Sequence, residues 1–552
     1  SPPWCEAMAL TSRQPKNDRK VIPLPTRHQV AGSTILVAAA TLASTLLGFT
    51  REVINAKYFG TSWEMDTFLA AAVVPTILFG VFNGALVNAL VPVFSELLER
   101  GQEERAWRVA STVINTLIIV LGFGALLGWI FAPYYIPLIA TGFPAPQMGV
   151  CVHMARIMLP TILCTSLAGV LSAILFSHHR FKAPAIQGIA INIATIGGVL
   201  LWHNHYGIFA LVFGTAAGLI VQLAVQIPPL VRSKPGYRLF IDLSDPAFRK
   251  IYDLLGPIMI GSAAGQMALF FDRFFASQLT PGYISGMNYA TKLVGFPQQI
   301  FAAAIATVLF PLLSAHFARE DRERLKETIV TGLRMVNFIS IPAVVGLVIL
   351  ARPIVATLFQ RGAFQSTATD LTAGLLPFAA VGLVALCTNI VLTRCAFACQ
   401  QTRWPVIFAV ATVLLNVALS ILWLPTLGAR GLLLANSVSQ TVQAIAMMYL
   451  IRSLIDGLRL RRVMLPMLRV TGAALVMAGA LVWIQHLHTH LEASVWGRID
   501  YLAGQLIIGG LVFAGVAILM RTPEVELAFN LIKEKIQAGV PSPGESNNAP
   551  IG

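Results

Sequence analysis

Charged side chains inside otherwise apolar segments are the residues of this chain best placed to do chemistry. Arg51 and Asp66 lie at the facing ends of two consecutive apolar segments. Lys292 lies about 12 Å inside another, at ~1.5 Å per helical residue. A charge at the centre of a bilayer costs from ~2.5 to more than 10 kcal/mol, so such residues normally face a cavity or a partner. Arginine offers planar bidentate donors and lysine a point charge, a combination that suits a phosphate or pyrophosphate group.

Two interpretations of the stretch GFTREVINAKYFGTSWEMDTF remain open. In the first, Arg51 and Asp66 form an ion pair that closes a helical hairpin through a turn at Gly60. In the second, Arg51 joins Lys292 and Arg273 around one cavity between two halves of the protein, and Asp66 organises or gates that site. Pro297 follows Lys292 closely and would kink its helix, which would open the helix towards an interior cavity.

Asp272, Asn416 and Asn436 are candidate oxygen ligands for a coupling monovalent cation, with interhelical hydrogen bonding as the alternative. Adjacent helix positions point about 100° apart, so Asp272 and Arg273 are expected to face different partners. The histidines of QHLHTH (485–490) are expected in a solvated loop. The sequence has no nucleophile elbow, nucleotide-binding loop or HExxH motif, so we expect no enzyme activity, no metal site and no nucleotide hydrolysis.

The elements that must position these residues are membrane-spanning helices. Hydrophobic residues make up 56% of the 552 residues and charged residues only 12%, with a mean hydropathy of +0.73. Soluble proteins have roughly a quarter charged residues. Apolar segments of about 20 residues recur along the chain, each long enough to cross a bilayer, and predict an all-α polytopic membrane protein with about fourteen spans. These spans are predicted at 30–50, 67–95, 109–138, 150–176, 184–203, 207–231, 251–279, 284–314, 327–350, 371–393, 404–424, 431–451, 463–485 and 501–520.

The positive charge follows the loops rather than a nucleic-acid surface. The net charge is +14, and most Lys and Arg residues fall in alternate loops such as HHRFK (178–182) and REDRERLK (319–326). The opposite loops, such as ATGFPAP (140–146), carry no charge. This asymmetry places the basic loops and both termini in the cytoplasm and predicts no nucleic-acid partner. The first 28 residues are expected to be an uncleaved polar tail.

The chain matches itself at a nearly constant offset. Phe49, Arg51, Gly60 and Pro75 fall on Phe271, Arg273, Gly282 and Pro297, and the same shift places Asp66 on Asn288. An even number of spans in each repeat predicts parallel repeats about an axis along the membrane normal, with a substrate site between them. The alternative to a duplication is that similar residues arose independently in the loops of the two halves. The predicted organisation is a tail (1–28), an N-lobe (29–232), a C-lobe (250–452), two added spans (463–520) and a second cytoplasmic tail, partly disordered (521–552).

Several long motifs resemble the MurJ (MviN) family of lipid II flippases, in the multidrug/oligosaccharidyl-lipid/polysaccharide exporter superfamily. They include GFTREVINAKYFGTSWEMDTFLAAAVVP, MNYATKLVGFPQQIFAAAIATVLFPLLS and LFQRGAFQSTATDLT, and the resemblance covers residues 30–520. It implies a V-shaped bundle in the bacterial inner membrane that works by alternating access. The substrate would be the undecaprenyl-pyrophosphate-linked peptidoglycan precursor, lipid II, moved from the cytoplasmic to the periplasmic leaflet for cell wall synthesis. The two added spans would form a groove for the lipid tail, and membrane potential or an ion gradient would drive transport.

The resemblance also assigns residues. The family's essential arginine falls on Arg51, its second-span aspartate on Asp66, and its basic eighth-span residue on Lys292, where arginine is usual. The usual first-span arginine is replaced by Thr45, and the usual second-span arginine pair falls at Phe79 and Gly80; the eighth-span charged cluster becomes Thr291, Lys292 and Gly295. The less charged site leaves two substrates open, lipid II or another polyprenyl-linked oligosaccharide of an exopolysaccharide or capsule. A cation-coupled drug exporter is disfavoured because the deep charge is basic. The expected partners are this glycolipid and membrane lipids, with contact to the cell wall synthesis machinery left open.

Overall fold

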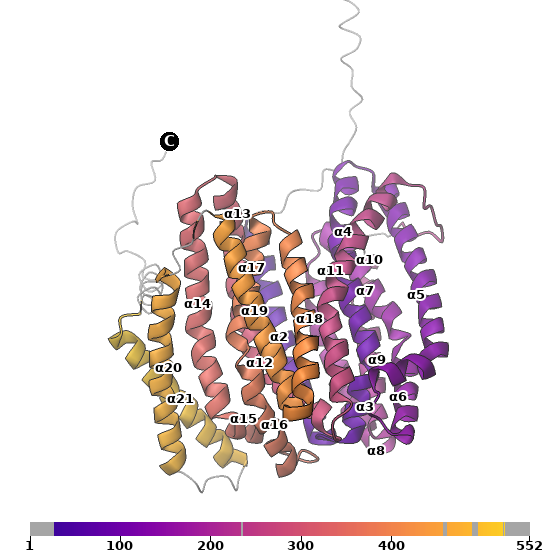
Figure 1. Ribbon diagram of the computed structural model, residues 1–552. Helices are drawn as coiled ribbons and strands as arrows, with labels where there is room; N and C mark the ends of the chain where they lie inside the picture. Colours follow the sequence, from indigo (N-terminus) through magenta and orange to yellow (C-terminus); the bar gives the residue numbers. More distant parts are fainter. Residues whose placement is uncertain are drawn as a thin grey trace, which may run out of the picture.

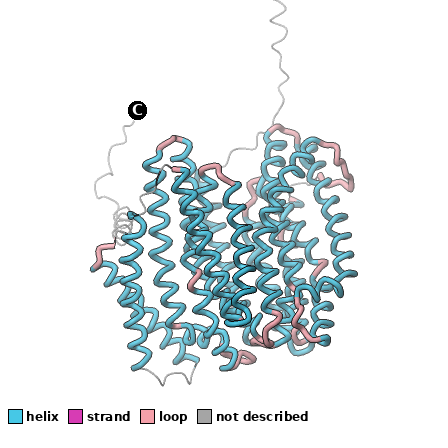
Figure 2. Tube along the Cα trace, in the orientation of Figure 1, coloured by secondary structure: helices cyan, strands magenta, loops and turns pink. Residues whose placement is uncertain are grey.

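The computed structural model describes residues 27–232, 236–455, 457, 461–487, 495–522 and 524. Within these residues every regular element is a helix, and the loops lie mainly at the two ends of a bundle (Figure 2). The predicted tails fall almost wholly outside the described residues. The first half contains α2 (Arg27–Phe59), α3 (Trp63–Ala71), α4 (Val73–Glu99), α5 (Glu103–Ile139), α6 (Ala145–Met158), α7 (Thr161–Ser177), α8 (Lys182–Tyr206), α9 (Phe209–Ala224) and α10 (Ile227–Val231).

The second half and the added helices follow in the same way. They are α11 (Pro246–Ala276), α12 (Tyr283–Pro297), the π-helical turn η1 (Gln298–Ala302), α13 (Ala303–Ala318), α14 (Arg322–Ile349), α15 (Ala351–Phe359), α16 (Ser366–Ala380), α17 (Leu383–Ala398), α18 (Arg403–Leu427), α19 (Ala429–Leu454), α20 (Arg461–Leu487) and α21 (Val495–Leu519). The predicted all-α polytopic fold is confirmed.

The span count agrees with the prediction apart from one helix. Among the described residues, 12 segments are long and apolar enough to cross a membrane, and α16 with α17 adds a thirteenth if the pair counts as one span bent by 44°. The remaining predicted span, 431–451, coincides with α19, which has 26 residues and packs on α16, α17 and α18. It does not meet the same apolar criterion because it carries Asn436, Gln440 and Gln443 within its length.

The packing of the helices recurs in the two halves. In the first half α2 packs on α8, α8 on α9 and α4 on α7; in the second half α11 packs on α18, α18 on α19 and α13 on α17. This recurrence supports two parallel six-span repeats. Helices α20 and α21 pack on each other and lie at one edge of the bundle, beside α14 (Figure 1).

The first span of each half also contacts the other half. Helix α2 contacts α12 and α15, and α11 contacts α4 and α5. We call the end of the bundle where α2 ends the outer end, following the predicted orientation, and the opposite end the inner end. Because α2 and α11 belong to both interfaces, side chains on them can respond to the relative position of the halves.

The second and fourth spans of each half are interrupted, and prolines lie beside every interruption. A proline has no N–H, so it leaves the carbonyl four residues earlier without its helical donor. The interruptions occur between α3 and α4 at Ala72, between α6 and α7 at Leu159–Pro160, at η1 after Pro297, and between α16 and α17 at Val381–Gly382. These breaks allow the two parts of one span to take different directions.

Candidate substrate-binding site

A buried glutamate is the centre of the charged site. Glu52 is only 6% exposed, and its carboxylate accepts a 2.9 Å hydrogen bond from the guanidinium of Arg51, which is partly exposed. Lys292 and Arg273 lie close enough to Glu52 to interact with it electrostatically. Three cations from α2, α11 and α12 therefore surround one carboxylate at the interface of the halves.

Glu52 was missed by the sequence reasoning. It follows Arg51 directly, and adjacent helix positions point about 100° apart. The spacing of the two residues therefore did not indicate an ion pair. The long side chains of arginine and glutamate nevertheless reach each other around the helix. The usable signal was the rarity of a glutamate inside an apolar segment.

Asp66 does not pair with Arg51, so the hairpin interpretation was wrong. Its carboxylate, 2% exposed, instead reaches across to the second half. There it accepts hydrogen bonds from the backbone N–H groups of Gly282 at 2.5 Å and Ser285 at 2.7 Å. These are free donors at the N-terminus of α12, where Gly282 takes a φ of 95°. Asp66 therefore caps a helix of the opposite half, in the position where a helix dipole favours negative charge.

The pairing expected between Arg51 and Asp66 exists between their counterparts in the second repeat. Arg273 is 9% exposed and donates to the side-chain oxygen of Asn288 at 3.1 Å and to the carbonyl of Ile284 at 3.2 Å. Arg273 thus fixes α11 to α12 and is not free to turn towards a ligand. Lys292, one turn beyond Asn288, is exposed on α12 together with Thr291.

Further contacts hold the halves together at the outer end. The hydroxyl of Tyr289 donates to the carbonyl of Gly60 at 3.2 Å, and the amide of Ala363 donates to the carbonyl of Lys57 at 2.8 Å. Gly60 has a φ of 56°, as the predicted turn requires. The end of α2 is therefore clamped by two elements of the second half in addition to the Asp66 cap.

The halves also touch at the inner end. Arg105 of α5 forms a two-pronged ion pair with Asp245, which caps the start of α11 by accepting from the amide of Ala247. The hydrogen bond from Arg105 holds the pKa of the Asp245 carboxyl below its ordinary value. Lys250 of α11 pairs with Glu96 of α4 at 2.8 Å.

The predicted cation ligands are brought together in part. Asp272 lies close enough to the side chain of Asn416 to interact with it, and the hydroxyl of Ser420 donates to the side-chain oxygen of Asn416 at 3.2 Å. Asn436 is partly buried on α19 and is not joined to this pair by any contact that the structure describes. Asp272 and Arg273 face different partners, as predicted. Ser420 was missed, although it lies one helical turn after Asn416.

Other intramembrane arginines have structural partners. Arg156 donates to the carbonyl of Trp129 at 3.0 Å and stacks on the Trp129 ring. Pro133, four residues after Trp129, leaves that carbonyl without its helical donor, so Arg156 replaces the missing bond. Arg334 pairs with the buried Glu524 at 2.6 Å.

The positions where the resemblance implied arginines are occupied by packing residues. The Thr45 hydroxyl donates to the carbonyl of Thr41 in its own helix. Gly80 lies directly against the side chain of Gln266 in α11, so a larger residue there would collide with α11. The site is therefore less charged than the pattern predicts, and Gly80 allows the close approach of the halves.

Two parallel six-span repeats with a charged cluster between them define a membrane transporter. The chain matches the family described as "Lipid II flippase MurJ" over residues 55–504. Because the match spans most of the sequence, the chain belongs to this family.

Curated relatives agree over nearly the whole length. A protein of Vibrio cholerae named probable lipid II flippase MurJ is 29% identical over 510 residues, covering 88% of this chain and 95% of the relative. The lipid II flippase MurJ of Burkholderia cenocepacia is 26% identical over 508 residues, covering 88% and 96%.

Solved structures show the same fold. A lipid II flippase MurJ in an inward closed conformation superposes with a TM-score of 0.77 at 26% identity, covering 88% of this chain and 99% of that one. An inward-facing multidrug resistance MATE family transporter has a TM-score of 0.67 at 14% identity, covering 76% and 98%, which shows likeness of fold alone.

Proposed function

We propose that this chain moves lipid II, the undecaprenyl-pyrophosphate-linked peptidoglycan precursor, from the cytoplasmic to the periplasmic leaflet of the bacterial inner membrane. The observation that carries this function is the cluster of Arg51, Lys292 and Arg273 around the buried Glu52 at the interface of the halves. The family to which the chain belongs supports the choice of substrate. The protein acts as a transporter and not as an enzyme.

The pyrophosphate binds by competing with Glu52 for the same cations. Arg51 is partly exposed and Lys292 is exposed, so both can turn to a ligand. A pyrophosphate offers more negative charge and more acceptor oxygens than one carboxylate, and arginine binds such a group with two parallel donors. Arg273 is already engaged, so it contributes positive potential and holds α12 in place.

Glu52 has a role of its own in the empty site. Without a counter-ion, cations held inside the membrane would carry the full cost of burial. Glu52 supplies that counter-ion and keeps Arg51 oriented at 2.9 Å. Once the pyrophosphate takes over the cations, their interaction with Glu52 weakens, which makes the occupied and empty sites electrostatically different.

Asp66 acts as the outer gate of the transport cycle. Its carboxylate joins the halves only while they are closed at the outer end, because both of its donors belong to α12. Opening towards the periplasm must therefore break these two hydrogen bonds. Release of the precursor and loss of the Asp66 cap are parts of the same step.

A monovalent cation couples to transport at Asp272, Asn416 and Ser420, with Asn436 as a further ligand in another state of the cycle. The proposal is supported by Asn416 of α18, which lies close to Asp272 of α11 and accepts a hydrogen bond from Ser420. Membrane potential would drive the cation inward. Both termini lie in the cytoplasm, in agreement with the basic loops at the inner end. Helices α20 and α21 hold the lipid tail.

The test is rescue of cells depleted of their own lipid II flippase, with the leaflet distribution of lipid II measured in the same cells. The chain should restore growth and flipping, and Arg51→Ala or Lys292→Ala should abolish both. Arg324→Ala is a matched control, because its pair with Asp321 is exposed at the surface and exposed pairs contribute little.

Two results would change the conclusion. Full activity of both Arg51→Ala and Lys292→Ala would show that the cations do not bind the pyrophosphate. Failure of the unaltered chain to rescue, with the protein present in the membrane, would assign it another polyprenyl-linked oligosaccharide.

A further inference from the structure

The eighth span contains one turn of π-helix below the charged site. Residues Gln298–Ala302 form η1, directly after Pro297. A π turn holds one residue more than an α turn, and such turns occur often at functional sites. If that residue is taken up into α-helical geometry, the helix on one side turns by about 100° and shifts by ~1.5 Å relative to the other.

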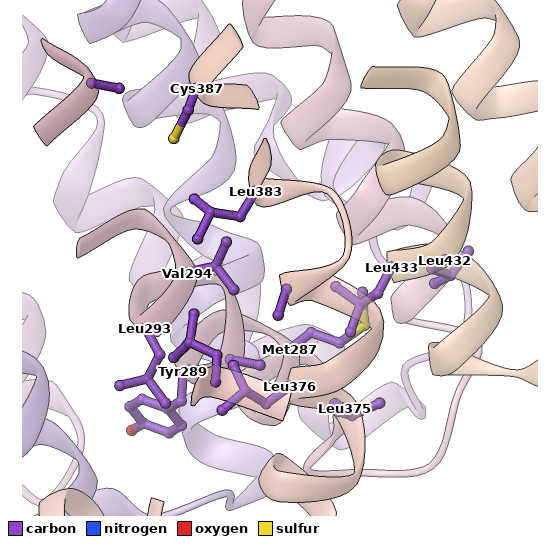
Figure 3. Packing of buried hydrophobic residues seen from close by; sticks show 14 of the residues in the cluster. Met287, Tyr289, Leu293, Val294, Leu375, Leu376, Leu383, Cys387, Leu432 and Leu433 are labelled. Atoms are coloured by element: carbon purple, nitrogen blue, oxygen red, sulfur yellow. The ribbon is translucent and has the colours of Figure 1, made fainter. Parts of the chain in front are cut away.

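The outer part of this span, α12, is fixed in place. Nine of its 15 residues are buried, and Figure 3 shows Met287, Leu293 and Val294 lying against side chains of α16 and α17, among them Leu376 and Leu383. Arg273 and Asp66 hold the same helix from α11 and from the first half. A turn of α12 would break this whole set of contacts.

The inner part, α13, is held far more lightly. Only Ala306, Leu309 and Leu313 of its 16 residues are buried, although the helix packs on both α14 and α17. Val308 is 68% exposed. A turn of α13 about its axis would therefore disturb fewer buried residues than a turn of α12.

Beside η1 lies a small apolar pocket with space for about one water molecule. Phe301 and Ala302 of η1, Val336 and Ser340 of α14 and Cys387 of α17 are among its lining residues. The Phe301 side chain is 45% exposed at this place. Ser340 is 3% exposed, and its hydroxyl has no hydrogen-bond partner among the residues that the structure describes. An unpaired hydroxyl in a buried apolar pocket is unfavourable, so a second arrangement that supplies a partner is stabilised relative to this one.

We propose that η1 is a register switch in which α13 turns about its axis against the fixed α12, so that the residues around the pocket and Ser340 are rearranged. The turn changes the inner half of span eight and leaves Lys292 and the Asp66 cap in place. It thereby opens or closes the inner mouth without disturbing the cations that hold the substrate. This inference rests on the proposed function, since it assigns the switch to the cycle that moves lipid II.

Two close contacts of the same kind allow a matched experiment. Gly332 of α14 lies directly under Leu309 of α13, and Gly286 of α12 lies directly under Leu371 of α16. A disulfide between Leu309→Cys and Gly332→Cys would hold α13 in its present orientation. A disulfide between Gly286→Cys and Leu371→Cys would join two helices that do not move in this scheme. Both pairs are introduced into a variant whose six native cysteines are replaced and whose lipid II flipping in proteoliposomes is first shown.

Oxidation of the first pair should slow flipping by roughly tenfold or more, since conformational steps limit many transport and catalytic cycles, and a reductant should restore it. Oxidation of the second pair should leave flipping unchanged. Unchanged flipping with the first disulfide formed would overturn the proposal, and so would equal loss with both disulfides. Failure of the parent variant to flip lipid II would count against the proposed function instead.

A second measurement needs no substrate. Hydrogen–deuterium exchange in the purified protein should be faster at residues 298–306 than in α12, because the switch breaks backbone hydrogen bonds there. The Leu309–Gly332 disulfide should slow that exchange, and the Gly286–Leu371 disulfide should not. Exchange at 298–306 that is as slow as in α12, or that the first disulfide leaves unchanged, would refute the switch.

Discussion

Replacing Asp66 by asparagine should open the outer end of the protein. The carboxylate accepts two backbone hydrogen bonds from the N-terminus of α12, from Gly282 and Ser285, and it is almost wholly buried. Asparagine keeps one acceptor oxygen but places an amide donor against the second N–H group. The substitution therefore removes the negative charge and one hydrogen bond from the contact between the halves.

The magnitude follows from the type of bond. A hydrogen bond to a charged group contributes about 1.5–3 kcal/mol, and an unsatisfied buried N–H costs a similar amount. Because the contact exists only when the outer end is closed, about 2–3 kcal/mol is lost from the closed state alone. This changes the ratio of closed to open molecules by roughly 30- to 150-fold. Flipping should slow, because the empty carrier no longer returns readily to the state that is closed outside.

Spin labels at Trp63→Cys and Gln278→Cys, on opposite halves at the outer end, would report the change as a distance distribution. Both positions are exposed. Asp66→Asn should add or enlarge a longer-distance population. Glu64→Gln is the control, since it removes the same charge from the same helix and makes no contact with α12 that the structure describes. A distribution that is identical in Asp66→Asn and the parent would refute the gating role.

Three further outcomes follow from single contacts. Arg156→Ala should destabilise the protein by about 1–2 kcal/mol, through loss of the bond to the Trp129 carbonyl and of the stacking. In a Pro133→Ala background the backbone N–H of residue 133 can donate to that carbonyl, so Arg156→Ala should then have a clearly smaller effect on thermal unfolding. Asp245→Asn should lower the thermal midpoint at neutral pH. Because the native carboxyl has a lowered pKa, its contribution is complete above the ordinary aspartate value near ~4 and is lost as the pH falls through the lowered one, so the two proteins should differ equally at pH 7 and pH 5 and converge only in stronger acid. Asp272→Asn should abolish the dependence of flipping on monovalent cations while leaving binding of lipid II intact, and an unchanged cation dependence would exclude this site.

The spans and the repeat were predictable from the sequence because they depend on composition and spacing. Apolar segments of the right length must cross the bilayer as helices. Apolar residues of two spans often match by chance, but matches of Arg, Gly and Pro at equivalent positions indicate a repeat. The partners of individual charges were not predictable in the same way. Asp66 bonds to backbone groups of the opposite half, and backbone donors leave no trace in a sequence. Arg156 likewise donates to a backbone carbonyl, that of Trp129, which Pro133 leaves without its helical donor.

The repeat also explains why only one of two matched arginines can serve a ligand. Arg51 and Arg273 occupy equivalent positions, but Asn288 stands where the first half has Asp66. A neutral asparagine accepts from Arg273 within its own half and locks it, whereas the charged Asp66 leaves its half to cap α12. Among the contacts that the structure describes, Arg51 therefore pairs with the adjacent Glu52 and not across its own hairpin, and a pyrophosphate can displace Glu52 from it. Asn288→Asp should thus bind Arg273 more tightly and leave Arg51 unaffected. Asp66→Asn should instead release the contact between the halves. A change between aspartate and asparagine therefore has a different consequence at the two equivalent positions.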